Sequence, residues 1–238
     1  MTRFTLGRWG RRAVWGTFVV LTCIGCQPLQ IAAFMFARED KRPAPYPLTF
    51  DKESPKKDKD EVVVLLLTHQ TASSGTTFVT ADRELADRLA RILPELAKEN
   101  KDKRKLRVIS STQFDKFKMT NPKWRDMSAG EIGQKLGADF VLDIFLDRMR
   151  LYQPNSANTI YEGRAEVTVA VHEVSATGGE LKDQYPLTFQ YPRGGVSTRD
   201  ASSVSEGEFK KLFLDNMATE IARMHCDHKP SSGIADGR

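Results

Sequence analysis

Residues 131–142 read Glu-Ile-Gly-Gln-Lys-Leu-Gly-Ala-Asp-Phe-Val-Leu and mark the change from a short helix to a strand. Ser128 and Glu131 have the Ser-x-x-Glu spacing of a capping box, in which the hydroxyl and the carboxylate each accept a hydrogen bond from an otherwise unpaired backbone N–H. Gly137 is well placed as the left-handed residue that follows the last helical turn. The sequence therefore predicts a helix that begins after Ser128 and ends before Gly137.

The next segment, Ala138–Leu151, admits two interpretations. As a helix it would bring Asp139, Asp143 and Asp147 onto one stripe, about 6 Å apart, which suits acid chemistry or a shared metal. As a strand it separates successive aspartates by roughly 13 Å, and it gathers apolar side chains on one face: Phe140, Leu142, Ile144 and Leu146. The preceding glycine and the β-rich sequence that follows favour the strand. We therefore expect the three aspartates to be charges on the solvent face.

The segments on both sides of this strand predict one sheet covered by helices. We expect strands at Val62–Leu67, Leu106–Ser110, Tyr161–Val174 and Leu181–Tyr191, and amphipathic helices at Ala81–Lys98 and Ser205–Met224. The first strand-helix-strand unit requires a right-handed crossover and parallel pairing, whereas the last three strands fit an antiparallel meander. The predicted fold is α/β (α+β), a single mixed sheet with a parallel start, an antiparallel meander and helices covering the sheet.

The first 25 residues are typical of a secretory signal peptide. Residues 1–12 carry four arginines and no acid, and Ala13–Gly25 is an apolar run of 13 residues. A cationic stretch before an apolar run of roughly 7–15 residues indicates export, since a spanning helix needs about 20. The run ends at Cys23-Ile24-Gly25-Cys26, which resembles the bacterial lipobox. That resemblance implies cleavage before Cys26 and attachment of lipid to its thiol.

A single transmembrane anchor is the alternative to cleavage. Ala13–Ala37 is 25 residues long without a charge, and the preceding arginines would hold its start in the cytoplasm. Gln27, Pro28 and Gln30 lie near its middle, where polar groups are unfavourable. Both interpretations place the domain in the cell envelope, tethered to a membrane and facing the periplasm. Among lipoproteins, the absence of aspartate after Cys26 favours the outer membrane.

Composition divides the rest of the chain. Residues 26–60 are expected to be a lipidated N-terminus and flexible tether, because Arg38–Asp60 is rich in proline and charge; only Leu48 and Phe50 in it are candidates to dock. Residues 61–228 form the α/β domain and 229–238 a loose tail. The net charge of +5 (36 minus 31) falls to +1 (32 minus 31) without the first 25 residues. The basic Lys101–Arg107 is then a solvated turn, and no nucleic-acid partner is expected.

Two stretches are candidates for an exported hydrolase or metal-binding enzyme. Ser73 and Ser74 precede Gly75 in a polar loop, but the chain has neither a Gly-x-Ser-x-Gly elbow nor a glycine-rich phosphate loop with lysine. His225-Cys226-Asp227-His228 holds four metal-ligand types in sequence, but zinc sites draw ligands from two separated segments, and His69 and His172 stand alone. We expect no catalytic site, cofactor or metal here. Cys226 is the one cysteine left after cleavage and lipidation, so no internal disulfide is expected.

Several of these segments together resemble a known family. Val62–Leu67, Ala81–Leu96, Leu106–Ile109, Glu131–Leu142 and the turn Thr177–Glu180 resemble the envelope lipoproteins related to the curli-secretion channel subunit and to the penicillin-binding-protein activators, whose fold is akin to the N-terminal domain of TolB. The resemblance implies that Leu-Gly-Ala-Asp is a structural signature, so no catalytic residues carry over. The membrane-inserting segments that a secretion channel needs are not found in the sequence, which departs from that subfamily.

These observations predict a non-catalytic, membrane-anchored lipoprotein that serves as an envelope assembly or protein-interaction module. Its partners would be the membrane, through lipid on Cys26, and another envelope protein or further copies of itself. An edge of the sheet or the loop Thr68–Thr80 is the expected contact. Two alternatives remain open, the exported enzyme described above and a transport accessory with an apolar cavity under the sheet.

Overall fold

The computed structural model describes residues 41–50, 54, 56–71, 76–100, 104–192, 199–200 and 202–229. The predictions for the leader, for Cys26 and for Ser73 and Ser74 lie outside these residues. Within them, no helix combines the length and the apolar character needed to cross a membrane.

The predicted strands and helices occur in the predicted order, and the structure adds the helix α4 and the short strand β6. The strands are β1 (Glu61–Gln70), β2 (Lys105–Val108), β3 (Phe140–Tyr152), β4 (Ile160–Ser175), β5 (Gly178–Tyr191) and the short β6 (Arg199–Asp200). The helices are α3 (Ala81–Ala97), α4 (Ser111–Thr120), α5 (Ala129–Leu136) and α6 (Glu206–His225), with short 3-10 turns η2 (Thr76–Phe78) and η3 (Trp124–Asp126).

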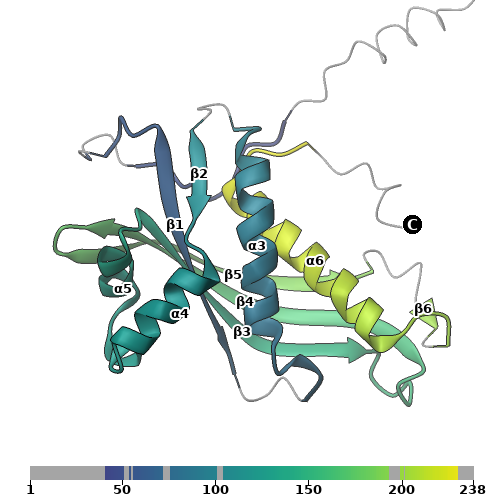
Figure 1. Ribbon diagram of the computed structural model, residues 1–238. Coiled ribbons are helices and arrows are strands. Elements are labelled where there is room, and N and C mark those ends of the chain that lie inside the picture. Colours follow the sequence, from purple (N-terminus) through teal and green to yellow (C-terminus); the bar gives the residue numbers. More distant parts are fainter. Residues whose placement is uncertain are drawn as a thin grey trace, which may run out of the picture. The chain divides into compact units, whose positions relative to one another are not determined.

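One mixed sheet organises the domain, with strand order β2-β1-β3-β4-β5 and β6 beside β4 (Figure 1). Strand β1 pairs in parallel with β2 and β3, as Val64 does with Val108 on one side and Phe140 on the other. The pairs β3–β4 and β4–β5 are antiparallel. The α+β fold predicted from the sequence is confirmed, with a parallel start, an antiparallel meander and helices on the sheet.

Local chemistry sets the entry into the central strand. Ser128 Oγ accepts from the Glu131 backbone N–H at 3.3 Å, and Glu131 Oε2 accepts from the Ser128 N–H at 2.7 Å, which completes the predicted capping box. Gly137 ends α5 with φ of 70°, a left-handed conformation that favours glycine. Residues 140–152 are then the strand β3, which confirms the strand over the helix for this segment.

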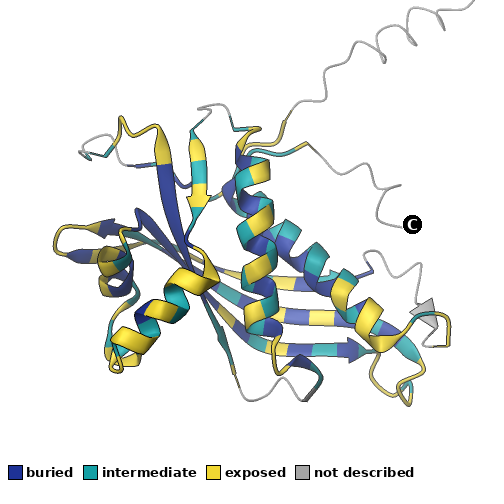
Figure 2. Cartoon of the chain, in the orientation of Figure 1, coloured by how far each residue is buried: buried dark blue, intermediate teal, exposed yellow. Residues whose placement is uncertain are grey.

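The sheet separates two apolar cores. Helices α3 and α6 pack on one face through residues such as Leu89 and Phe213, and α4 and α5 pack on the other through Phe117 and Ile132. Burial alternates with exposure along β3, β4 and β5, while the helices bury one side and expose the other (Figure 2). The two layers of helices therefore hold β1 between them.

Residues 41–50 differ from the predicted tether, because they pack against the domain. Leu48 and Phe50 are only 7% and 8% exposed, and Phe50 lies 5.1 Å from Phe140 between ring centroids. Tyr46 stacks on Tyr185 at 4.2 Å. The prolines and charges of this segment predict a tether. The docking could not be predicted from local composition, because the partner of Tyr46 lies more than a hundred residues away in the sequence and that of Phe50 about ninety.

Candidate binding groove beside strand β1

Strand β1 extends beyond its neighbour β2 and leaves part of one edge without a strand. Strand β2 pairs only with Glu61–Val64, and the last bond on that side runs from the Ile109 N–H to the Val64 carbonyl at 2.9 Å. On the other side, pairing with β3 continues to Gln70. Figure 1 shows β2 ending well before β1 does. The second half of β1 is therefore a sheet edge.

A groove of about 390 Å³ lies along this edge, between α3 and α4. Its lining includes Leu66 and Thr68 from β1, Val79 and Ala86 from the α3 side, and Phe114 from α4. Volumes of roughly 300–1,000 Å³ are usual for ligand sites. We refer to it below as the α3–α4 groove.

The groove occupies a position where open α/β sheets commonly bind ligands. The chain leaves β1 through α3 to reach β2 on one side, and it returns through α4 and α5 to β3 on the other side. Helices α3 and α4 lie on opposite faces of the sheet, so a crevice opens between them beyond the carboxyl end of β2. The topology therefore creates the groove without any special side chain.

Aromatic rings and cations form the α4 wall of the groove. The rings of Phe114 and Trp124 meet edge to face, with centroids 5.7 Å apart. Lys118 Nζ lies 4.2 Å from the Phe114 centroid, and the Arg125 guanidinium lies 5.3 Å from that of Trp124. This wall presents apolar ring surface with positive charge beside it.

Acidic side chains dominate the α3 wall. Asp82 and Asp87 line the groove, and among the described residues neither carboxylate has an ion-pair partner. Arg83 instead reaches across to α4, where its Nη2 lies 2.8 Å from Asp115 Oδ2. Hydrogen bonds from Lys118 and Arg83 hold the pKa of Asp115 below its usual value. The two walls therefore differ in charge, and one exposed ion pair joins them.

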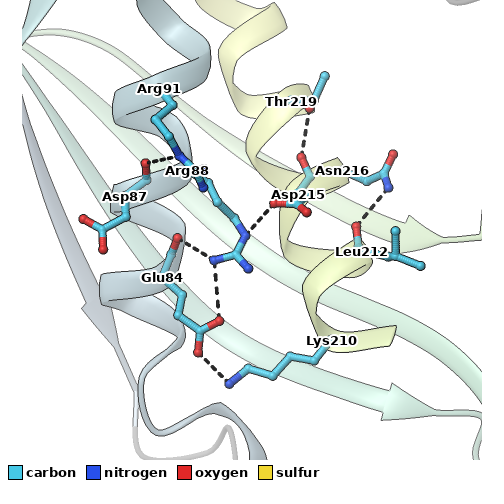
Figure 3. Close-up of polar contacts among 9 residues, drawn as sticks. All are labelled: Glu84, Asp87, Arg88, Arg91, Lys210, Leu212, Asp215, Asn216 and Thr219. Carbon is cyan, nitrogen blue, oxygen red and sulfur yellow. Dashed lines mark hydrogen bonds and ion pairs between the residues drawn. The ribbon is translucent and has the colours of Figure 1, made fainter. Parts of the chain in front are cut away.

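A polar network connects α3, which forms one wall of the groove, to α6 (Figure 3). Arg88, whose side chain is 11% exposed, places Nε 2.7 Å from Asp215 Oδ1 and donates from Nη1 to the Glu84 carbonyl at 2.9 Å. Lys210 Nζ adds a 2.8 Å contact with Glu84 Oε1. Burial acts to raise the pKa of Glu84, but hydrogen bonds from Lys210 and Thr80 outweigh it and lower that pKa. The Asp87 carboxylate points away from α6 in Figure 3.

The structure corrects the prediction for Asp139, which is buried and not on the solvent face. Its side chain is 1% exposed, with Oδ1 2.8 Å from Lys59 Nζ and 3.2 Å from Lys56 Nζ. Oδ2 accepts from the Val63 backbone N–H at 3.1 Å. Burial acts to raise the pKa of Asp139, yet these hydrogen bonds lower it overall. Asp139 thus joins the segment before β1 to the start of β3.

The other two aspartates lie apart from Asp139. Asp143 Oδ1 is 2.8 Å from His69 Nε2, and the His69 ring stacks on Phe145 at 4.9 Å. Asp147 Oδ2 accepts from the Thr168 hydroxyl at 3.1 Å. The three carboxylates face different partners along β3, so the structure does not bring them together as an acid or metal site.

The His225–His228 stretch likewise does not form a set of ligands. His225 is buried between Tyr46 and Tyr185, and burial lowers its pKa to about 4. Cys226 is a buried free cysteine, and Asp227 Oδ1 accepts from the Ala44 N–H at 3.1 Å. His228 exchanges backbone hydrogen bonds with Arg42. Within the described ranges, no three His, Cys, Asp or Glu side chains are grouped to hold a metal.

This stretch holds residues 41–50 on the domain, a role that sequence reasoning did not predict. The remaining histidine, His172, lies in β4 opposite Val141 of β3. The sequence also did not predict that the open edge of the sheet belongs to β1. The sequence predicted an edge of the sheet or the loop Thr68–Thr80 as a contact, without showing which edge is open; residues 72–75 of that loop lie outside the described residues.

No family model and no curated protein matches the chain. Among solved structures, the chain is similar to the PelC dodecamer from Paraburkholderia phytofirmans, with 11% identity, 79% of this chain and 97% of that chain covered, and a TM-score of 0.41. It is similar to hypothetical protein CT253 from Chlamydia trachomatis (15% identity, 68% and 96% covered, TM-score 0.38). It is also similar to lipoprotein GNA1162 from Neisseria meningitidis (14%, 68% and 98%, 0.37).

Proposed function

We propose that the protein is a bacterial lipoprotein, anchored in the cell envelope by lipid on Cys26, whose domain binds another envelope protein and does not catalyse a reaction. The leader supports the anchoring half, because a cationic start and an apolar run end at Cys23-Ile24-Gly25-Cys26. The periplasm-facing location and the preference for the outer membrane belong to this proposal.

The proposal that the domain binds another envelope protein rests on one observation, the α3–α4 groove along the free edge of β1. It combines open backbone, aromatic surface and carboxylates that no described residue pairs with, within one space of about 390 Å³. Two of its titratable side chains already have partners within the protein: Asp115 lies beside Lys118 and Arg83, and His69 lies beside Asp143. We therefore infer that the groove binds a partner by complementary charge and shape. Such an arrangement can orient a partner through charge and ring surface.

The docked N-terminal segment limits how far the domain can reach from its anchor. Fourteen residues lie between Cys26 and Lys41, where the described segment begins, so fifteen residue-to-residue steps connect the two. At no more than about 3.3–3.6 Å per residue, this distance is at most about 50 Å. A short connection raises the effective concentration of a membrane-bound partner and thereby supplements weak contacts.

The anchoring half is tested by intact mass and membrane fractionation of the wild type and Cys26→Ala. We expect the wild type to lose its leader, gain acyl mass and stay with membranes, and Cys26→Ala to keep its leader or lose its acyl mass. A wild type without added acyl mass would contradict the lipid anchor.

The binding half is tested by photo-crosslinking in intact cells. A crosslinking amino acid placed at Val79, which is 70% exposed at the groove, is compared with the same group at exposed Lys211 on α6. We expect a discrete crosslinked envelope protein from position 79 only. Equal products from both positions, or products from 211 alone, would contradict binding at the groove.

A further inference from the structure

We propose that the α3–α4 groove takes an extended peptide segment of the partner protein, which adds to the free edge of β1 as an extra strand and carries basic and apolar side chains in alternation. This inference rests on the proposed function and deepens it. It commits to a segment of another protein, and binding of a second copy of this chain is an outcome that the tests below can reveal.

The backbone of β1 is already oriented for strand addition. The Val63 carbonyl accepts from Asp139 N on the β3 side, whereas the Val64 carbonyl accepts from Ile109 N on the β2 side. Each residue of a parallel strand directs its N–H and C=O to one side, and the side alternates along the strand. Leu66 and Thr68 therefore direct both groups into the groove, beyond the end of β2.

The described residues provide no strand to satisfy these groups. The N–H of Thr71 donates to the Leu146 carbonyl of β3, which shows that the alternation persists to the end of the strand. From Leu66 to Gln70 the edge is about 13 Å long at roughly 3.3 Å per residue, so four or five residues of a partner fit beside it. Recognition by strand addition uses such an edge, with pockets for alternate side chains giving specificity.

The two walls predict which side chains the added strand carries. Successive side chains of a strand point to opposite faces, so one set would face α3 and the other α4. The set facing α3 meets the carboxylates of Asp82 and Asp87 and should be basic. The set facing α4 meets the rings of Phe114 and Trp124 and should be apolar. Basic side chains are disfavoured there because Lys118 and Arg125 already place positive charge beside the rings.

The ion pair that joins the walls does not prevent entry. The side chains of Arg83 and Asp115 are 66% and 32% exposed. Exposed pairs of this kind contribute little to stability, so opening this one for a peptide costs little. Lys118 remains within 3.1 Å of Asp115 Oδ1 and would keep that carboxylate paired.

Thr68→Pro tests strand addition at the backbone. Proline removes the Thr68 N–H, which faces the groove, and leaves the ladder with β3 intact, as in edge strands that tolerate proline. Thr68→Ala keeps the N–H and is the matched control. The full-length proteins are titrated with a fluorescent Val-Lys-Val-Lys-Val-Lys-Val peptide. We expect roughly tenfold weaker binding to Thr68→Pro and less than twofold change for Thr68→Ala. Equal affinity for both variants, with matching circular dichroism, would overturn strand addition.

Charge reversal tests the predicted side-chain pattern. The wild type should bind the Val-Lys peptide at least roughly tenfold more tightly than the Val-Glu peptide of the same length. Asp82→Lys with Asp87→Lys should reverse this preference, whereas Glu95→Lys with Glu180→Lys, an equal charge change at exposed positions outside the groove, should preserve it. A wild type that shows no saturable binding of the Val-Lys peptide, or a control double variant that also reverses the preference, would overturn the assigned chemistry.

The outcomes separate this inference from the proposed function. If position 79 crosslinks to an envelope protein and Thr68→Pro leaves that product undiminished, strand addition is wrong while partner binding stands. If position 79 gives no product, partner binding at the groove itself fails. A product made of two copies of this chain would contradict the assignment to another protein.

Discussion

His225 Nδ1 lies 2.8 Å from the backbone carbonyl oxygen of Tyr46, which belongs to the segment that precedes β1. A carbonyl only accepts, so Nδ1 carries the proton, and Nε2 accepts from the Tyr185 hydroxyl at 2.9 Å. The neutral imidazole therefore joins three parts of the chain in one buried place. The strength of this connection depends on the imidazole remaining uncharged.

Acidification should weaken the domain through His225. Burial lowers its pKa to about 4 from 6.5, so below pH 6.5 the unfolded chain binds a proton that the native state does not. The free energy of unfolding then falls as the pH drops from 6.5 towards 4, by about 3 kcal/mol at most. Urea unfolding across this range should show a steeper loss for the wild type than for His225→Asn. Parallel pH profiles for the two proteins would contradict this role.

Phe50→Ala should destabilise the domain by about 3 kcal/mol, because the side chain is only 8% exposed and packs near Phe140. Pro43→Ala, at an exposed position of the same segment, should change the free energy of unfolding by less than about 0.5 kcal/mol. Chemical denaturation of both variants measures this. Equal and negligible effects would show that residues 41–50 behave as a tether.

Asp139→Asn should cost about 2 kcal/mol, less than the ~3–5 kcal/mol of a fully buried pair, because Lys56 and Lys59 are partly exposed. The pKa of Asp139 is lowered in the folded state, so its contribution is present above the unfolded pKa of about 3.9 and is lost as the pH falls through the folded pKa. Denaturation at neutral pH and below pH 4 should show the difference from wild type shrinking with acid. Asp147→Asn, as a control, should have a smaller effect at both.

Arg88→Ala should destabilise the protein by about 2 kcal/mol, because it removes charged hydrogen bonds between α3 and α6. Arg91→Ala on the same helix removes an exposed side chain whose one hydrogen bond within the described ranges goes to the Asp87 carbonyl, at 3.3 Å. It should cost less than about 0.5 kcal/mol. Thermal unfolding distinguishes the two, and similar melting temperatures would mean that the network in Figure 3 contributes little.

Local signals were sufficient to predict the fold. The capping box at Ser128 and Glu131, the stop at Gly137 and the alternation after it each act within a few residues. They fix the order of helices and strands, and right-handed crossovers fix the pairing of the parallel strands. The sheet could be predicted for this reason.

The site depends on distances that sequence patterns do not contain. Asp139 is buried because Lys59, 80 residues earlier, reaches it. The free edge exists because β2 has four residues and β1 has ten, whereas the strands predicted from the sequence, Val62–Leu67 and Leu106–Ser110, are of similar length. Relative strand length and long-range pairing are properties of the assembled sheet, so the groove became visible only in the structure.

Hydrogen exchange at the Thr68 backbone amide tests the free edge of β1 most directly. In the protein alone, the Thr68 N–H should exchange faster than those of Leu67 and His69, which face β3, and the Val-Lys peptide should slow it selectively. Equal protection of all three amides in the free protein, or no change at Thr68 when peptide is bound, would contradict the account.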